Sequence, residues 1–333
     1  MTLRIAINGF GRIGRNILRA QIEAPRDGIE IVAINDLAPA ELSAHLLKYD
    51  SVHGPLKQDV RAEPNCITVG DKSYHYTSQP DPAQQDYKGL GVDLVLESTG
   101  RFTDGPSASA HLEAGASRVI ISAPAKSVDR TVVFGVNHTT ITADDKIISN
   151  ASCTTNCLAP LAAVLARSCG IEQGFMTTIH SYTSDQQLLD SEHRDLYRAR
   201  AAALNMIPTS TGAARAIGLV LPELDGRLDG VAVRVPTPNV SAVDLVFQPE
   251  RIMDAEALNA AMIEASEGPL KGVLDVTDKP LVSSDMNHNP ASSVLHLDQT
   301  RCMEGGLTRL FSWYDNEWGF SNRMLDVSAY LAH

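Results

Sequence analysis

The chain has 333 residues, of which 44% are hydrophobic and 20% charged, the balance of an ordinary globular protein with room for two cores. Its net charge of -12 argues against nonspecific binding to nucleic acid or anionic membranes. Five cysteines without disulfide-type spacing favour a reducing, cytoplasmic compartment, and no apolar run approaches the roughly 20 residues that a membrane span needs.

The first predicted strand, residues 3–7, leads directly into a glycine-rich turn. Gly9, Gly11 and Gly14 fit the pattern G-x-G-x-x-G, and a helix is predicted from about Asn16 to Glu23. In this pattern the first glycine permits the tight turn, the second lets the backbone approach a pyrophosphate, and the third lets the helix pack closely. Free N–H groups at the helix start suit phosphates, to which Arg12 would add a positive charge.

A second apolar run, residues 30–34, is followed by Asp36. This acid lies 22 residues after Gly14, close to the spacing of about 20 expected for the acid that binds the adenosine ribose. A carboxylate there favours NAD, because it would repel the 2′-phosphate of NADP. The alternative is that Asp36 caps the next helix, predicted over residues 39–49.

Further strands are predicted over residues 92–97, 118–122 and 146–149, with a helix over about 107–114. Strands that alternate with helices predict a parallel sheet with helices on both faces. Ligands bind beyond the carboxyl ends of such strands, where Ser98, Thr99 and Ser122 lie. The polar segment 49–54 is predicted to be a loop, and no chemistry is assigned to it.

Residues 149–160 place Cys153 just before an apolar run. Hydroxyl and amide residues ahead of such a run predict a helix whose first turn carries Cys153. The helix dipole would favour the thiolate form of this cysteine. Cys157 follows one turn later, and we expect it to be a small buried core residue, which is also the alternative for Cys153.

In the second half of the chain, strands and helices no longer alternate regularly. Strands are predicted over residues 174–182, 230–235, 241–247 and 307–314, and helices over 212–220, 254–266 and 321–331, typical of an α+β domain. His180 ends the first strand, as a site residue or a structural histidine. Arg234 lies inside an apolar strand and needs an anion or several structural acceptors. Residues 209–214 offer hydroxyl and N–H groups that suit phosphate.

Eight motifs are typical of one family: INGFGRIGR (7–15), AIND (33–36), STGRFT (98–103), SNASCTTNCLAP (149–160), HSYTSDQ (180–186), RARAAALNMIPTSTGAA (198–214), RVPTPNVS (234–241) and WYDNEWGFSNR (313–323). On these motifs the chain resembles the phosphorylating (type I) glyceraldehyde-3-phosphate dehydrogenases over nearly its whole length. The resemblance implies an α/β Rossmann dinucleotide-binding domain (1–150), to which the C-terminal helix (317–333) returns, and an α+β catalytic domain (151–316). It also implies a homotetramer.

The resemblance assigns roles residue by residue. Cys153 corresponds to the nucleophile and His180 to its base. The residues that correspond to cofactor contacts are Gly9, Gly11, Arg12, Ile13, Gly14, Asp36, Ser122 and Asn316, the last holding the nicotinamide carboxamide. Inorganic phosphate would be bound by Ser152, Arg198, Thr211 and Gly212, and the phosphate of the substrate by Thr183, Asp185 and Arg234. Thr154 is grouped with these phosphate residues, Arg200 is expected to be structural, and no metal is expected.

The implied reaction is the NAD-dependent oxidation of D-glyceraldehyde 3-phosphate, with inorganic phosphate, to 1,3-bisphosphoglycerate through a cysteine thioester, in glycolysis or gluconeogenesis. Two departures stand out: Ser191-Glu192 replaces a common Leu-Pro, as in members that accept NADP, and Phe320 replaces a common Tyr. NAD is still expected to be preferred over NADP. The alternatives are an erythrose-4-phosphate dehydrogenase, which would lack the TSTGAA segment, a hydrolase that uses Cys153, and a nonenzymatic nucleotide sensor.

Overall fold

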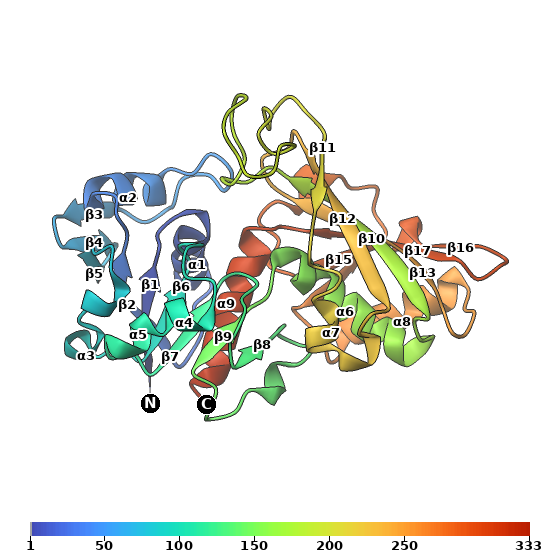
Figure 1. The fold of residues 1–333 in the computed structure, drawn as a ribbon, viewed down its shortest axis with the longest axis horizontal. Helices are drawn as coiled ribbons and strands as arrows, with labels where there is room; N and C mark the ends of the chain where they lie inside the picture. The colour runs from blue at the N-terminus through green and yellow to red at the C-terminus, as the bar shows by residue number, and fades with distance from the viewer. Residues whose placement is uncertain (1) are drawn as a thin grey trace. The chain divides into compact units, whose positions relative to one another are not determined.

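The computed structural model describes residues 2–333 and divides the chain into two compact units (Figure 1). The first unit comprises the chain up to Phe134, His138–Ser152 and Ser321–His333, and the second comprises Gly135–Asn137 and Cys153–Phe320. The predicted domain divisions lie at 150/151 and 316/317, whereas the corresponding divisions between the two compact units lie at 152/153 and 320/321.

The first unit is built on a nine-stranded sheet with the order β3-β4-β5-β2-β1-β6-β7-β9-β8. The strands from β5 to β8 in this order pair in parallel, whereas β3, β4 and β5 pair as antiparallel hairpins. The strand bounds are β1 Leu3–Asn8, β2 Ile29–Asn35, β3 Val60–Glu63, β4 Cys66–Val69, β5 Lys72–Thr77, β6 Leu94–Glu97, β7 Arg118–Ile121, β8 Arg130–Thr131 and β9 Ile147–Ser149. The predicted doubly wound parallel sheet is confirmed.

The helices of the first unit connect these strands. Their bounds are α1 Arg12–Glu23, α2 Ala40–Lys48, α3 Tyr87–Leu90, α4 Gly105–Ala108 and α5 Ala110–Glu113, with 3-10 turns η1 Pro82–Gln84 and η2 His138–Thr140. Helix α1 begins earlier than predicted because Gly11 serves as its N-cap. The helix predicted over 107–114 is split, and its first part is capped by the Asp104 carboxylate, which accepts the Ser107 N–H at 2.9 Å.

The last helix, α9 Trp318–Leu331, crosses the division between the units. Its later turns pack within the first unit, where the Arg26 guanidinium donates to Asp326 Oδ1 at 2.9 Å and to Asn322 Oδ1 at 2.7 Å. No helix among residues 2–333 is both long enough and apolar enough to cross a bilayer.

The second unit is built on an eight-stranded mixed sheet with the order β11-β12-β10-β13-β17-β15-β14, in which β16 also pairs with β17. The strand bounds are β10 Gln173–Ser181, β11 Ile207–Ser210, β12 Leu228–Val235, β13 Ser241–Gln248, β14 Leu274–Thr277, β15 Ser293–His296, β16 Arg301–Cys302 and β17 Thr308–Tyr314. The helices are α6 Cys153–Ser168, α7 Ile217–Val220 and α8 Ala255–Glu267, with 3-10 turns η3 Pro222–Leu224, η4 Ser283–Met286 and η5 Leu297–Gln299. This arrangement confirms the predicted α+β domain.

One face of the second sheet is covered by helices. Helix α6 packs on β15 and β17, and α8 packs on α6 and β14 (Figure 1). In β10 the alternate side chains of Met176, Thr178 and His180 are buried, whereas Phe175 and Ile179 on the opposite face are 49% and 38% exposed. His180 therefore lies on the buried face, at the end of its strand.

Two segments differ from the sequence prediction. The helix predicted over 212–220 forms only as α7, because residues 213–216 make turns after the Thr211 hydroxyl accepts the Ala213 N–H at 3.2 Å. The hairpins of β3, β4 and β5 were not predicted, because their short polar strands lack a clear apolar period.

Candidate active site and dinucleotide pocket

The structure brings Cys153 and His180 together. Cys153 is the first residue of α6, and its Sγ lies 3.6 Å from Nε2 of His180 at the end of β10. Ala151, two residues earlier, has a positive φ of 55°, a strained conformation for a residue with a Cβ. Cys157 is fully buried, and burial raises the pKa of its thiol to about 12. The prediction that Cys157 is a core residue is confirmed.

The backbone of the next residue fixes the histidine ring. His180 Nδ1 lies 2.7 Å from the carbonyl oxygen of Ser181, which can only accept, and 3.1 Å from Nη1 of Arg234, which can only donate. The shorter contact assigns the proton to Nδ1. The neutral ring then presents the lone pair of Nε2 to the thiol of Cys153. This is the tautomer that a general base at this position needs.

Burial opposes charge on both members of the pair. It raises the pKa of the Cys153 thiol, although the positive charge of Arg234 and hydrogen bonds from Thr154 lower it. Burial, and next the charge of Arg234, lower the pKa of His180 to about 3. Burial therefore opposes the thiolate that the helix dipole would favour.

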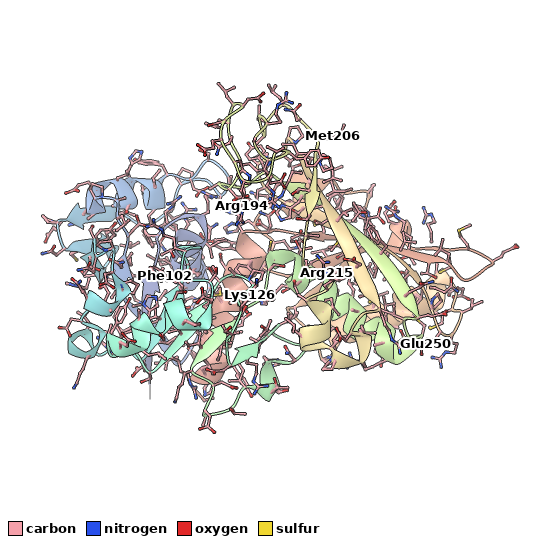
Figure 2. All side chains as sticks on the ribbon, viewed as in Figure 1. Phe102, Lys126, Arg194, Met206, Arg215 and Glu250 are labelled. Atoms are coloured by element: carbon pink, nitrogen blue, oxygen red, sulfur yellow. The ribbon has the colours of Figure 1, made fainter. Side chains whose placement is uncertain are left out.

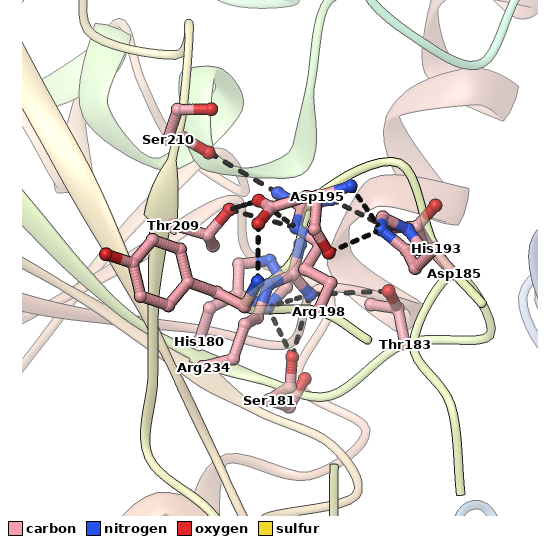
Figure 3. A network of polar contacts seen from close by, with 11 residues as sticks. His180, Ser181, Thr183, Asp185, His193, Asp195, Arg198, Thr209, Ser210 and Arg234 are labelled. Atoms are coloured by element: carbon pink, nitrogen blue, oxygen red, sulfur yellow. Dashed lines mark hydrogen bonds and ion pairs between the residues drawn. The ribbon is translucent and has the colours of Figure 1, made fainter. Parts of the chain in front are cut away.

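Arg234 lies beside this pair because β12 pairs in parallel with β10, with His180 opposite Arg234. Its Nη1 donates to the Ser181 carbonyl oxygen at 2.9 Å and to Thr183 Oγ1 at 3.3 Å (Figure 3). Its Nε is buried and has no hydrogen-bond partner among residues 2–333. The guanidinium thus has structural acceptors and retains a donor for a further anion.

Arg198 occupies a neighbouring network (Figure 3). Its Nη1 donates to Asp185 Oδ2 at 2.7 Å, and its Nε donates to Thr209 Oγ1 at 3.0 Å. Burial alone would raise the pKa of Asp185, but the hydrogen bond and charge of Arg198 lower it. Asp185, which was expected beside Thr183 and Arg234, therefore pairs with the arginine of the other predicted phosphate site.

The remaining residues of the predicted phosphate sites vary in exposure. A Cβ added to Gly212 would meet nothing within 4 Å, so the backbone there faces open space. Ser152 directly precedes α6. Thr154 is only 4% exposed, and its hydroxyl lies 2.8 Å from that of Tyr314. Arg200 forms an exposed ion pair with Asp190 at 2.7 Å.

Tyr314 was not identified from the sequence. Its buried hydroxyl lies 2.8 Å from Thr154 Oγ1 and 2.9 Å from Thr178 Oγ1, which ties α6 to β10. Its ring meets that of His180 edge to face, with centroids 5.9 Å apart. A tyrosine in a strand is common in protein cores, so the sequence carried no signal for this role.

The first unit contains a cavity of about 240 Å³ at the glycine turn. It is lined by Asn8, Gly9, Gly11, Asn35, Asp36, Leu37, Gln79, Pro80, Ser98, Thr99, Arg101 and Phe102. Gly9 has a φ of +92°, and a Cβ there would lie 2.6 Å from the Thr99 nitrogen. A Cβ at Gly14 would lie 2.1 Å from the Gly9 oxygen, whereas one at Gly11 would meet nothing within 4 Å. Gly9 and Gly14 therefore pack too closely on neighbouring backbone for any side chain, whereas the backbone at Gly11 is free to approach a ligand.

Asp36 lines this cavity. Its two oxygens accept the backbone N–H groups of Phe10 at 2.6 Å and Ala38 at 2.9 Å. It does not cap α2, whose N-cap is Pro39, so the capping alternative is wrong. Ser98 Oγ, also at the cavity, is buried and has no partner among residues 2–333. These groups fit a ligand rich in hydroxyl and phosphate oxygens.

The other predicted cofactor residues lie around the same turn. Ile13 is in the first turn of α1, and Ser122 directly follows β7 at the carboxyl end of the sheet. The Arg12 guanidinium pairs with the Asp50 carboxylate, with Nη2 and Oδ1 3.2 Å apart. Although burial opposes it, the hydrogen bond from Arg12 lowers the pKa of Asp50. The segment 49–54, to which no chemistry was assigned, thus holds Arg12.

A buried carboxylate supports the floor of the cavity. Glu97 Oε2 accepts from Asn8 Nδ2 at 2.6 Å and lies 3.0 Å from His111 Nε2, while Oε1 accepts the Thr99 N–H at 2.7 Å. Glu97 and His111 are at most 1% exposed. This network, which the sequence analysis missed, fixes two residues that line the cavity.

Asn316, in the second unit, follows β17. Its Oδ1 accepts hydrogen bonds from Ser181 Oγ at 3.0 Å and Ser241 Oγ at 2.9 Å.

Among residues 2–333, no group of three or more His, Cys, Asp or Glu side chains is arranged to hold a metal ion.

A Rossmann unit and a cysteine–histidine pair beside two arginines define a nicotinamide-dependent oxidoreductase. Residues 3–105 match the family model described as "Glyceraldehyde 3-phosphate dehydrogenase, NAD binding domain", and residues 152–316 match the model of the C-terminal domain of the same enzyme. The chain belongs to the glyceraldehyde-3-phosphate dehydrogenase family.

Relatives of similar length carry the same description. A glyceraldehyde-3-phosphate dehydrogenase of Cereibacter sphaeroides is 61% identical over 328 residues, which cover 98% of each chain. One of Xanthobacter flavus is 60% identical with the same coverage. Glyceraldehyde-3-phosphate dehydrogenase 1 of Bacillus subtilis is 54% identical over 333 residues, 100% of this chain and 99% of the relative.

Proposed function

We propose that this chain oxidises D-glyceraldehyde 3-phosphate with NAD and inorganic phosphate to give 1,3-bisphosphoglycerate. The observation that carries the proposal is the pairing of Cys153 Sγ with His180 Nε2 at 3.6 Å beside the Arg234 guanidinium. A nucleophile, a base and a cation suited to phosphate are what phosphorylating oxidation of a phosphorylated aldehyde requires.

The chemistry begins at Cys153 and His180. Cys153 Sγ attacks the aldehyde carbon while His180 Nε2 takes the thiol proton. The oxyanion that develops on the former carbonyl oxygen is stabilised by the backbone N–H of Cys153 at the start of α6. His180 then moves the proton to and from this oxygen. Bound NAD supplies the hydride acceptor, and Cys153 is left as a thioester.

Inorganic phosphate completes the reaction. A phosphate oxygen attacks the thioester carbon, the carbon–sulfur bond breaks, and the Cys153 sulfur regains a proton from His180. Arg198, Thr211, Gly212 and Ser152 are proposed to hold this phosphate, and Thr183, Asp185 and Arg234 the phosphate of the substrate. The thioester conserves the free energy of oxidation that hydrolysis would dissipate.

The cofactor is proposed to bind at the glycine turn of the first unit. The open backbone at Gly11 suits a pyrophosphate, and the Asp36 oxygens suit the ribose hydroxyls. Arg12, Ile13, Gly9, Gly14 and Ser122 complete the proposed contacts there, and Asn316 is proposed to hold the nicotinamide carboxamide. A carboxylate at Asp36 supports a preference for NAD over NADP.

We also propose a homotetramer in a reducing, cytoplasmic compartment. The loop 182–206 carries exposed apolar side chains, whose exposure lies between 73% and 83% at Leu188, Leu189, Leu196, Leu204 and Met206 (Met206 is labelled in Figure 2). Several exposed apolar side chains in one loop favour a role in association. Five free cysteines fit a reducing environment.

The test is NADH formation with D-glyceraldehyde 3-phosphate and with erythrose 4-phosphate, each with and without inorganic phosphate. The proposal predicts phosphate-dependent reduction and a higher kcat/KM for the triose, all abolished in Cys153→Ser. A preference for erythrose 4-phosphate would select that dehydrogenase instead. Turnover unaffected by phosphate would indicate a hydrolytic route, and NAD binding without turnover would indicate a sensor.

A further inference from the structure

Three strand ends meet at the side chain of Asn316. Ser181 is the last residue of β10, Ser241 is the first residue of β13, and Asn316 lies two residues after the end of β17. Antiparallel pairing sets Ser241 opposite Tyr314 and Ala242 opposite Ile179, which brings these ends together. The two serines are at most 1% exposed and Asn316 is 6% exposed.

The hydroxyl hydrogens decide how the amide of Asn316 is turned. Ser241 Oγ accepts the Ser181 N–H at 3.1 Å and donates to Asn316 Oδ1 at 2.9 Å. Ser181 Oγ donates to the same oxygen at 3.0 Å. Both hydroxyl hydrogens thus end on Oδ1, which uses both of its lone pairs.

The opposite amide orientation would leave a hydroxyl hydrogen without an acceptor. If Nδ2 faced the serines, only the 3.5 Å contact between the two Oγ atoms would remain as an acceptor for their two hydrogens. One of them would then be buried and unsatisfied, which is costly. The Nδ2 group, by contrast, has no protein acceptor among residues 2–333 in the observed orientation.

The backbone around Asn316 is also fixed. Asp315 Oδ1 accepts the N–H groups of Glu317 at 3.0 Å and Trp318 at 2.8 Å, and Oδ2 accepts from Asn239 Nδ2 at 2.9 Å. The side chain of Asn316 therefore projects from a turn that the Asp315 carboxylate holds by three hydrogen bonds.

We infer that Ser181 and Ser241 are positioning residues that lock Asn316 as a hydrogen-bond donor, so that the site holds nicotinamide through the carbonyl oxygen of its carboxamide. The inference rests on the proposed role of Asn316 in cofactor binding. Ser181 has two functions in this view, because its backbone oxygen fixes the tautomer of His180 while its hydroxyl fixes the amide of Asn316. A change to alanine removes only the second function.

The test compares NAD with 3-acetylpyridine adenine dinucleotide, in which a methyl group replaces the carboxamide nitrogen and the carbonyl oxygen remains. A donor at Asn316 binds both dinucleotides, whereas an acceptor binds NAD alone. Asn316→Ala should therefore lower kcat/KM by about tenfold with each of them, leaving their ratio unchanged.

The decisive variant is the double change Ser181→Ala, Ser241→Ala. Without the two serines the Asn316 amide can rotate, so only a fraction of the molecules presents Nδ2 to the cofactor. With NAD, kcat/KM should fall about three- to tenfold. With the analogue, kcat/KM should fall at least about twofold further. Ser312→Ala, a buried serine of β17 that does not contact Asn316, is the matched control and should leave the ratio unchanged.

The outcomes separate this inference from the proposed function. If Asn316→Ala impairs turnover but the double serine variant matches the wild type, the locking role is wrong. If Asn316→Ala impairs only NAD, Asn316 is an acceptor and the inference is likewise wrong. If Asn316→Ala changes neither cofactor, the proposed cofactor role of Asn316 fails. The single variants Ser181→Ala and Ser241→Ala give intermediate ratios and replace the double variant if it does not fold.

Discussion

Two cysteines one helical turn apart have opposite environments in this protein. Cys153, at the start of α6, is partly exposed and its Sγ faces His180 Nε2, whereas Cys157 is fully buried and its Sγ lies 3.5 Å from Ser293 Oγ. Although the two cysteines lie in one sequence motif, their surroundings in the structure differ.

Replacing the two cysteines by serine should give different results. Cys153→Ser should abolish phosphate-dependent NAD reduction while NAD binding, measured by calorimetry, is retained. Cys157→Ser should retain substantial activity, because the pKa of this thiol is raised to about 12 and it takes no part in the chemistry. Retention of turnover by Cys153→Ser would remove it as the nucleophile.

Because the pKa of His180 is lowered in the folded protein, the free energy of unfolding should depend on pH. In the folded protein this pKa is about 3, whereas an unperturbed histidine has a pKa of 6.5. Between these values the unfolded state binds a proton that the folded state does not, so the free energy of unfolding falls as the pH is lowered. One such group contributes up to about 1.4 kcal/mol per pH unit.

His180→Asn should therefore flatten the decrease in unfolding free energy between pH 6.5 and 4.5, measured by urea denaturation. An identical pH dependence in the variant and the wild type would contradict a buried neutral histidine. Arg234→Gln, which removes the neighbouring cation, should raise the pKa of His180 and flatten the decrease in part.

At the scale of elements, the long apolar runs were predicted well and the polar connections poorly. The strands β1, β2 and β6 and the helices α6 and α8 followed from periodicity and capping, because their buried faces dominate their sequences. The contact of Arg198 with Asp185 lies within the loop 182–206, and the contact of Asn316 with Ser181 joins residues that are distant in sequence. Neither contact can be predicted from local sequence patterns.

The loop 182–206 and strand β11 provide a test of the phosphate assignment. Arg198→Ala removes a guanidinium held by Asp185 and Thr209, and it should raise the KM for inorganic phosphate about 10- to 100-fold while the KM for NAD changes little. Arg200→Ala, which breaks only an exposed ion pair with Asp190, is the matched control. An unchanged phosphate KM in Arg198→Ala would exclude it from this site.

The turn after β2 carries Asp36, the residue proposed to set the preference between NAD and NADP. With NADP, the Asp36 carboxylate would face a phosphate, and two unit charges about 4 Å apart repel by roughly 4 kcal/mol at an effective dielectric of 20. Ser191 could donate one hydrogen bond to that phosphate, worth at most about 3 kcal/mol. A clear preference for NAD in kcat/KM is therefore expected.

Asp36→Asn should narrow that preference, chiefly by improving NADP. Asparagine keeps an oxygen for one of the N–H groups of Phe10 and Ala38 and removes the charge, so the turn is largely retained. Comparable kcat/KM values for NAD and NADP in the wild type would contradict the role assigned to Asp36.

At the scale of the whole molecule, the exposed apolar side chains bear on association. Leu196→Asp places a charge at a leucine that is 83% exposed in the loop 182–206. Sedimentation velocity should show a tetramer for the wild type and smaller species for this variant, because a buried unpaired charge at an interface is costly. Ile252→Asp, at an exposed position outside this loop, is the control. A monomeric wild type would contradict the proposed assembly.

Oxidation through a thioester on Cys153 can be tested by a single turnover in the absence of phosphate. The protein is mixed with NAD and D-glyceraldehyde 3-phosphate, quenched in acid and examined by peptide mass spectrometry. A thioester intermediate predicts a burst of NADH, an acyl group on Cys153, and loss of that acyl group when inorganic phosphate is added before the quench. A burst of NADH with no acyl group, or with the group on another cysteine, would contradict it.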